Sequence, residues 1–509
     1  MSGYIGITIG PIIDTLMLAH SPAAMWYASS MFSSLTEKMC EILLKNSCII
    51  LSPYYEEEKK YDDGIGRYHD RIIAKNVEST KIVEKSIEDG KEYIAHMVAG
   101  NINKPNDAEI KNFIKQYLQV HWVYLDSMEE DENPIIKIGG ILDTLEQMHS
   151  PNPNNANNPF FELFTGKEFK NEYVKKRIEE IVENSQLKKG KNLKSIPDIT
   201  SPLPEEERSR KREFYYTIVQ ADGDGMGKYI ESLKENEMTA FSKACFDYAE
   251  SAAKLIGNYG GMTVYAGGDD LLFIAPVTGV NNKTVYDLCK EISDDFTKRF
   301  SNGPTLSFGV AIRHDGFPLY EALNSALWAL EKAKSGRENP DSSGYIEKSG
   351  RNTMLVDFQK GSGQAVKIAV PFEKFEYFKA AIDLYNVDEN DNQKFKSAIY
   401  VLENMKSLFK PAIKKITSSD ENAEKYLENV VKNIFDNEGQ KIGEAFIKKY
   451  CKALCNYVSN NNDVRKMYVM GLKKGYMENN DNSDEYNILK GFEAILRLSK
   501  FMIEKKGDK

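Results

Sequence analysis

Residues 262–277 read MTVYAGGDDLLFIAPV, two short apolar runs that meet at Gly267-Gly268-Asp269-Asp270. Apolar runs of this length, separated by glycine and aspartate, predict two strands joined by a tight hairpin turn. Two adjacent carboxylates at a hairpin tip repel each other. Either the tip is an ordinary turn, or its charge serves to hold a cation.

The residues around this hairpin, 213–360, alternate between strand and helix patterns. Strands are expected at EFYYTIVQ (213–220), MTVYA (262–266), LLFIAPV (271–277) and TLSFGVAI (305–312), and helices at 226–256, 285–300 and 319–334. The order is therefore βαββαβ with one helix added. This is the ferredoxin-like arrangement, in which the central hairpin faces the end of the first strand.

The N-terminal 130 residues give a weaker version of the same order. Strands are expected at YIGITI (4–9), SCIILSPYY (47–55), DRIIAK (70–75) and LQVHWVYLD (118–126), and helices at 31–44 and 77–97. This internal duplication lacks a pair of carboxylates at its hairpin, so a single active metal site is expected in the second copy. His69-Asp70 precedes the third strand, and we interpret it as a turn into that strand and not as a nuclease site.

Two segments rich in turn-forming and charged residues, 151–159 and 187–212, predict exposed connections. After about residue 370, apolar residues at spacings of three and four predict long amphipathic helices. The chain is thus expected to be an α+β protein with two ferredoxin-like domains, a helical middle region and an all-α C-terminal domain. The expected domains are residues 1–130, 131–212, 213–368 and 369–509.

The composition limits the class of protein. No apolar run approaches the roughly 20 residues that cross a bilayer, so no membrane segment is predicted and we expect a cytoplasmic protein. Six scattered cysteines fit a reduced compartment, and Cys451 and Cys455 have no second pair to complete a zinc site, so no zinc is expected. A formal net charge of −9 argues against a free-standing nucleic-acid binder, so partners are expected to hold any nucleic acid.

Acidic residues also follow the first strand of the second copy, where residues 219–228 read VQADGDGMGK. Carboxylates where a buried strand ends are costly unless they face water or a cation. In the ferredoxin-like arrangement Asp222, Asp269 and Asp270, with the Gly223 carbonyl, would form a cluster of hard oxygen donors that suits Mg²⁺ or Mn²⁺. Two such ions would serve phosphoryl chemistry by activating a hydroxyl and neutralising a leaving pyrophosphate. Each motif alone is more often an ordinary turn or a solvated loop.

Two further features bear on a nucleotide site. Gly267 and Gly268 permit positive backbone angles and leave room for a nucleotide over the hairpin. Lys334 ends the helix expected at 319–334, where small alanines at helical spacing permit close packing on the sheet. This lysine could stabilise the helix dipole or bind a γ-phosphate, and its position leaves both interpretations open.

Together these motifs resemble the second palm of the CRISPR polymerase, the large subunit of type III interference complexes, in a type III-B-like form. The residues that carry the resemblance are the ADGDGMG run (221–227), the YAGGDD hairpin (265–270), and the LSFGVAI strand (306–312) followed by ALWALEKAK (326–334). IGPIID (9–14) and QVHWV (119–123) resemble the first, degenerate palm of that family, and SIPDIT (195–200) resembles the segment that precedes the second.

The resemblance implies two palms of the nucleotide cyclase type and a metal-dependent nucleotidyltransferase that turns ATP into a second messenger when target RNA binds. Asp222, Asp269 and Asp270 would hold the metals together with the Gly223 carbonyl. The donor ATP would contact Gly225, Gly267, Gly268 and Lys334, and the acceptor would lie near Gly10 and Asp14. Other protein subunits, guide RNA and target RNA are the implied partners.

The chain departs from many relatives in two ways. Its first palm begins within ten residues of Met1, so no histidine-aspartate nuclease domain is expected, and no four-cysteine zinc site lies between the palms. Within the family the product would be a cyclic oligoadenylate or a conjugate of AMP with S-adenosylmethionine, and we slightly favour the conjugate. A diguanylate cyclase shares the palm, but Leu271 follows the aspartates where an aromatic residue is usual. A catalytically inactive scaffold subunit is the non-enzymatic alternative.

Overall fold

The structure is a computed structural model of the 509-residue chain. It describes residues 3–56, 65–101, 106–129, 132–148, 196–200, 214–300, 303–335, 350–385, 399–400, 404–437, 444–460, 468–469 and 484–506. The chain divides into two compact units, one of Met1–Leu306 with Asp315–Asn324 and one of Ser307–His314 with Ser325–Lys509, so the division falls within β8 and α13.

The first palm has the predicted βαββαβ order. Its strands are β1 (Gly3–Gly10), β2 (Ile49–Ser52), β3 (Arg71–Val77) and β4 (Gln119–Leu125). Its helices are α1 (Ile12–Met17), α2 (Pro22–Lys45), α3 (Thr80–Asn101), α4 (Ala108–Tyr117) and α5 (Pro134–Glu146). The strands form a sheet in the order β2-β3-β1-β4, and β1 pairs antiparallel with both β3 and β4. This strand order is that of a ferredoxin-like sheet.

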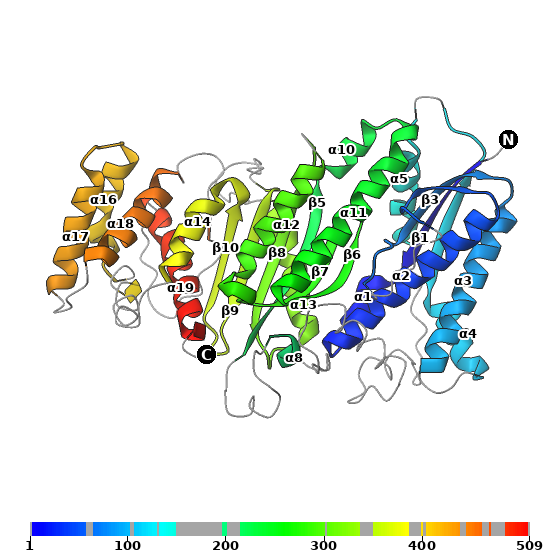
Figure 1. Cartoon of the computed structure of the whole chain (residues 1–509), viewed down its shortest axis with the longest axis horizontal. Coiled ribbons are helices and arrows are strands. Elements are labelled where there is room, and N and C mark those ends of the chain that lie inside the picture. The colour runs from blue at the N-terminus through cyan, green and yellow to red at the C-terminus, as the bar shows by residue number, and fades with distance from the viewer. Residues whose placement is uncertain are drawn as a thin grey trace. The chain divides into compact units, whose positions relative to one another are not determined.

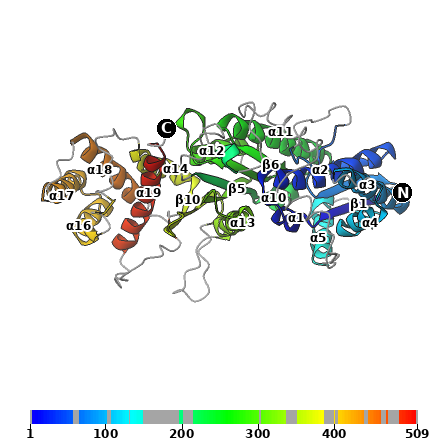
Figure 2. The ribbon, with the colours of Figure 1, turned by 90° about the horizontal axis from the view of Figure 1, so that it is seen from below.

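Both faces of the first sheet are covered. A Cβ atom added at Gly6 on β1 would lie 2.1 Å from an Ile138 side-chain carbon, so Gly6 faces α5 directly. Because side chains alternate along a strand, Ile5 and Ile7 face the opposite side, where both are fully buried. Figure 2 shows β1 between α2 and α3 on one side and α5 on the other. The predicted domain boundary at residue 130 therefore precedes a helix that packs on the first palm.

The second palm repeats this order along the chain. Its elements are β5 (Tyr215–Asp224), α10 (Met226–Glu231), α11 (Glu235–Tyr259), β6 (Met262–Gly267), β7 (Asp270–Pro276), the short η1 (Val280–Asn282), α12 (Val285–Arg299), β8 (Thr305–His314) and α13 (Leu319–Ser335), preceded by α8 (Ile196–Thr200). In the first unit β5, β7 and β6 are neighbours in that order and pair antiparallel. Helices α11 and α12 lie side by side on one face of these strands (Figures 1 and 2).

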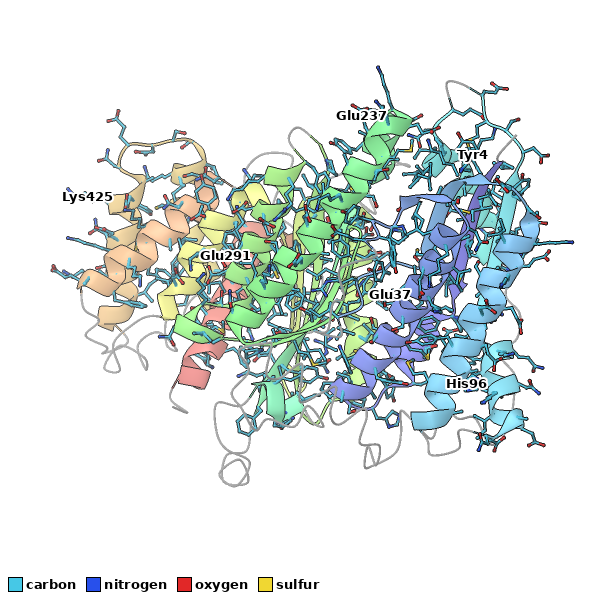
Figure 3. The ribbon with its side chains drawn as sticks, turned by 45° about the vertical axis from the view of Figure 1, so that its right-hand side comes forward. Tyr4, Glu37, His96, Glu237, Glu291 and Lys425 are labelled. Carbon is cyan, nitrogen blue, oxygen red and sulfur yellow. The ribbon has the colours of Figure 1, made fainter. Side chains whose placement is uncertain are left out.

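The two palms dock within the first unit through the start of α11. The Tyr4 hydroxyl on β1 donates to Glu235 Oε2 at 2.9 Å, and Lys75 on β3 pairs with the other oxygen of Glu235. Figure 3 labels Tyr4 on β1 and Glu237 in the first turn of α11. Met238, on the same helix, is fully buried in a cluster with residues of the first palm, namely Leu51, Ile73, Ile138 and Leu142. The interface is thus apolar at its centre.

The second unit holds the rest of the chain. Its further elements are β9 (Thr353–Gln359), β10 (Ala365–Pro371), η2 (Phe372–Lys374), α14 (Phe375–Ile382), η3 (Asp383–Tyr385), α16 (Lys406–Thr417), α17 (Ala423–Asn437), α18 (Glu444–Ser459), β11 (Tyr468–Val469) and α19 (Asp484–Lys506). The C-terminal region is helical as predicted, apart from the two-residue strand β11, which pairs with β10. The hairpin of β9 and β10 was not predicted.

The alanines of α13 have the predicted packing role. A Cβ atom at Gly309 on β8 would lie 2.1 Å from the Ala326 carbonyl oxygen, so helix and strand are in direct backbone contact. Ala329 and Ala333 are fully buried in a cluster with Leu355 and Ala369. Among the described helices, none combines the length and apolar character needed to cross a bilayer.

Candidate functional site

The hairpin predicted at residues 262–277 is present. Gly267 pairs with Asp270, so Gly268 and Asp269 form the turn between β6 and β7. Gly268 has φ +68°, a backbone conformation that favours glycine, as predicted. Gly267 does not have a positive φ. Its added Cβ would lie 2.7 Å from the Tyr265 hydroxyl and 2.8 Å from the carbonyl oxygen of Arg67, so the backbone of the first palm helps to leave no room for a side chain there.

The end of β5 lies beside this tip, as the ferredoxin-like order predicts. Ala221 pairs with Leu271, and a Cβ atom added at Gly223 would lie 2.3 Å from Asp269 Oδ2. Asp269 therefore lies directly over the Gly223 backbone. Asp222 and Asp224 are the last acidic residues of β5. Asp222 is half-buried, whereas Asp224 is buried and accepts a hydrogen bond from Thr305 Oγ1 at 3.0 Å.

A cavity of about 360 Å³ opens at the hairpin tip, entirely within the first unit. Its volume lies in the range of small-molecule sites. The first palm contributes Ser52, Pro53, Tyr54, Arg67, His69, Asp70, Arg71, Ile73, Ile135 and Gly139, and the second palm contributes Met226, Ile230, Phe241, Ser242, Cys245, Phe246, Gly267, Gly268, Asp269 and Asp270. The aromatic and aliphatic side chains suit the faces of a nucleobase. The charged residues of the lining come from two segments, residues 67–71 of the first palm and residues 269–270 of the second.

The charged residues in the first-palm wall of the cavity affect one another's pKa. Burial raises the pKa of Asp70 to about 6, against a lowering by the nearby Arg71 cation and with a smaller increase from Glu146. Burial lowers the pKa of His69 to about 4, and the nearby Arg71 cation lowers it further. Burial alone would lower the pKa of Arg71, but the carboxylates of Glu146 and Asp143 raise it above its usual value.

Hydrogen bonds fix this wall. Arg71 donates from Nε to Glu146 Oε1 at 2.9 Å and from Nη2 to Asp143 Oδ1 at 2.6 Å. His69 Nε2 lies 2.9 Å from Ser52 Oγ, and its Nδ1 accepts from the Arg71 backbone N–H at 3.3 Å. Since β3 begins at Arg71, His69-Asp70 does lead into that strand as predicted. The same pair also lines the cavity, which the sequence interpretation missed.

The donor chemistry at the tip fits a hard divalent cation, because Asp269 and Asp270 are adjacent carboxylates on the cavity. Asp269 lies so close to Gly223 that any side chain at position 223 would clash with it. Asp222 does not line the cavity. Within the described ranges, no group of three or more histidines, cysteines, aspartates or glutamates is arranged to hold a metal ion. The three-carboxylate cluster therefore stays a prediction.

The other predicted residues lie in different places. Gly225 caps the start of α10 with φ +77°. Gly10 and Asp14 do not line the cavity, and Asp14 is exposed on α1. Lys334 lies in the last turn of α13, in the second unit. The first palm instead reaches the cavity mainly with Ser52–Tyr54 and with Arg67, His69, Asp70 and Arg71. The one signal that marked this segment in the sequence was His69-Asp70.

Comparison with known proteins identifies the second palm. Residues 215–341 match the family model of the Cas10/Cmr2 second palm domain. The CRISPR system Cmr subunit Cmr2 of Pyrococcus furiosus is 28% identical over 196 residues, which are 32% of this chain and 21% of that protein. The chain thus matches about a fifth of the length of this curated relative. These matches confirm the predicted resemblance, and the chain is Cas10-like.

A solved structure shows a similar fold over more of the chain. A type III-B Cmr-β structure in the apo state has a TM-score of 0.55 at 12% identity and covers 98% of this chain and 82% of its own. A Csm1–Csm4 cassette in complex with cA4 has a TM-score of 0.46 at 12% identity, with 89% and 70% covered. The Cmr-β match shows a similar fold over nearly the whole chain.

Proposed function

We propose that this Cas10-like chain is the metal-dependent nucleotidyltransferase subunit of an RNA-guided type III antiviral complex. It would transfer AMP from ATP to an acceptor when target RNA binds, making a nucleotide second messenger. The observation that supports this proposal best is the cavity in which the Gly267–Asp270 tip faces a wall supplied by the first palm. Each palm contributes one wall of this cavity, so a donor bound to one wall and an acceptor bound to the other would lie next to each other.

In the proposed reaction an acceptor hydroxyl attacks the α-phosphorus of ATP. A new P–O bond forms to the acceptor, the bond to the β-phosphate oxygen breaks, and pyrophosphate leaves with the electron pair while the hydroxyl proton passes to solvent. Asp269 and Asp270, with Asp222 and the Gly223 carbonyl, would hold Mg²⁺ or Mn²⁺. Bound cations of this kind lower the pKa of the hydroxyl and neutralise charge on the leaving group.

The glycines and Lys334 belong to the donor side of this proposal. Gly225, Gly267 and Gly268 let the backbone approach the nucleotide, and Lys334 would bind its γ-phosphate. The acceptor side is better assigned to Asp70 and its neighbours than to Gly10 and Asp14, because only the former line the cavity. Other subunits and guide RNA would complete the complex.

For the acceptor we favour S-adenosylmethionine over a second ATP. Arg71 is already paired with Glu146 and Asp143, so its charge is largely neutralised, and Asp70 adds a carboxylate to the same wall. A wall of this charge suits a cationic sulfonium better than another triphosphate. A cyclic oligoadenylate is the product if ATP serves as acceptor instead.

The test is to incubate the target-RNA-bound complex with labelled ATP and Mg²⁺ or Mn²⁺, with and without S-adenosylmethionine, and to identify products by mass. An adenylate conjugate that forms only with S-adenosylmethionine would support our choice of acceptor. Oligoadenylate products would support the proposed adenylyl transfer but show that ATP, and not S-adenosylmethionine, is the acceptor. Guanylate products from GTP would indicate a diguanylate cyclase, and no turnover with any activating RNA would indicate a scaffold.

The metal site is tested by Asp269→Ala combined with Asp270→Ala, which should abolish pyrophosphate release and leave complex assembly intact. A matched control is Asp294→Ala with Asp295→Ala, an adjacent acidic pair of the same domain on α12. These two aspartates form ion pairs with Lys290 and Arg299, one helical turn away. Partly exposed pairs within one helix contribute little to stability, so the control should keep full activity. Equal activity of both double variants would refute the metal-site assignment.

A further inference from the structure

A strap of the first palm, residues 65–70, runs along the edge of the second palm's hairpin. The Ala266 backbone N–H donates to the Gly66 carbonyl at 2.9 Å, and Gly66 forms a parallel bridge with Tyr265. β6 is the outer strand in the order β5-β7-β6, so the strap pairs with its open edge. The strap thereby contacts the strand that ends in Gly267.

Helix α2 holds this strap with a stripe of buried hydroxyl groups, Ser29, Ser33 and Thr36. They are 3%, 7% and 1% exposed, and their spacing of four and three residues places them on one face of the helix. Ser33 Oγ accepts from the backbone N–H groups of Arg67 and Tyr68, both at 3.0 Å. Buried backbone N–H groups need such partners, because leaving them unsatisfied is costly.

The other two members of the stripe differ in their contacts. Thr36 Oγ1 has two acceptors for its single hydrogen, the His69 carbonyl at 3.1 Å and the Phe32 carbonyl of its own helix at 3.3 Å. Ser29 Oγ has no hydrogen-bond partner among the residues that the structure describes. It lies below Gly66, where an added Cβ would come within 2.5 Å of it. Two hydroxyls of the stripe therefore hold the strap by hydrogen bonds, and the third only packs against Gly66.

The strap and the tip are packed too closely to move independently. Gly267 cannot carry a Cβ because the Arg67 carbonyl lies in the way, and Gly66 is confined between Ser29 and Tyr265. None of these hydroxyl groups lines the cavity, so they act on it only through the strap. A shift of the strap would change the position of Asp269 and Asp270 relative to β5.

We propose that Ser33, Thr36 and Gly66 are positioning residues, through which α2 of the first palm fixes the Gly267–Asp270 tip. The consequence for catalysis rests on the proposed nucleotidyl transfer, whereas the mechanical coupling does not. The first palm then does more than supply one wall of the cavity. It determines where the metal-holding carboxylates stand.

The test compares Ser33→Ala with Ser29→Ala in the full chain, by hydrogen exchange of peptides that span residues 262–276. Ser33→Ala should raise exchange at the hairpin about tenfold, because two buried N–H groups of the strap lose their acceptor. Ser29→Ala removes an equally buried hydroxyl of the same face and should leave exchange at the hairpin unchanged. Equal exchange in the two variants would overturn the proposal.

A second pair guards against simple loss of folding. Thr36→Val keeps the shape of the side chain and removes its hydroxyl, whereas Thr36→Ser keeps the hydroxyl. Thr36→Val should raise hairpin exchange and the concentration of Mn²⁺ that gives half-maximal pyrophosphate release, with the rate at saturating Mn²⁺ retained, and Thr36→Ser should restore both. If Ser and Val behave alike, the positioning role is wrong. If the wild type releases no pyrophosphate but exchange responds as expected, the coupling stands and the proposed reaction fails.

Discussion

Replacing Asp70 by Asn should make the protein more stable, and the gain should grow with pH. Burial raises the pKa of Asp70 from 3.8 to about 6 in the folded protein. As pH rises above about 4 the unfolded chain ionises first, so the native state progressively loses stability until the pH passes 6. Integrated over this window, the cost of the carboxylate reaches at most about 3 kcal/mol at pH 7.5 and about 1.6 kcal/mol at pH 5.

Asn resembles the protonated carboxyl and does not ionise. The stability difference between Asp70→Asn and wild type should therefore increase by about 1.4 kcal/mol in favour of Asn between pH 5 and pH 7.5. The nearby titration of His69 is common to both proteins and cancels. Urea unfolding at the two pH values measures the difference, with EDTA present because a divalent cation would change the titration of a nearby carboxylate.

Asp14→Asn is the control for net charge, since it removes one exposed carboxylate from the same palm. Its effect on stability should be small at both pH values. A stability difference for Asp70→Asn that is constant or shrinks with pH would refute the reasoning, because it would mean that the carboxylate is as well solvated in the folded chain as in the unfolded one. A cost of this size is expected where a charge is kept for binding.

Three further predictions concern other sites. His69→Gln should reduce the loss of stability between pH 6.5 and pH 4 by up to about 3 kcal/mol, as measured by acid unfolding curves. Burial lowers the pKa of His69 to about 4, so only the unfolded chain gains the proton as pH falls through 6.5. Gly267→Ala should cost about 1–3 kcal/mol in urea unfolding, since its Cβ would meet the Arg67 carbonyl at 2.8 Å. Glu493→Ala should cost about 3–5 kcal/mol by the same measurement, because it leaves the Lys406 cation, 5% exposed, in a buried site; a loss below 1 kcal/mol would contradict this.

Most of the fold could be predicted because its signals are local. The hairpin at 262–277 combines two apolar runs with a turn that needs glycine, and its φ of +68° at Gly268 follows from that chemistry. The alternation of strand and helix patterns gave the order of both palms. Strand ends were less accurate. β5 continues to Asp224, four residues beyond the predicted end, because polar residues at the end of a strand look like a loop in sequence.

The cavity wall of the first palm could not be predicted in the same way. Arg67, Asp70 and Arg71 come together with Asp269 only because one palm docks on the other, and no periodicity records such a contact. The role of Gly267 could not be predicted for the same reason, because its glycine requirement comes from a contact and not from a positive φ. Its neighbour is a backbone carbonyl 200 residues earlier in the chain. The hydroxyl stripe of α2 likewise looks like an ordinary polar interruption of an apolar helix.

The two palms share one connectivity but use their hairpins differently. In the second palm a two-residue turn joins β6 to β7 and can present little more than Asp269 and its neighbours. In the first palm the connection from β2 to β3 is much longer, so its last residues can leave their own sheet and pair with the edge of β6. One hairpin supplies the charge, and the other supplies the strap and the opposite wall. For the proposed nucleotidyl transfer, changes in the first palm should therefore alter acceptor choice and metal affinity, whereas changes at Asp269 or Asp270 should remove the chemistry itself.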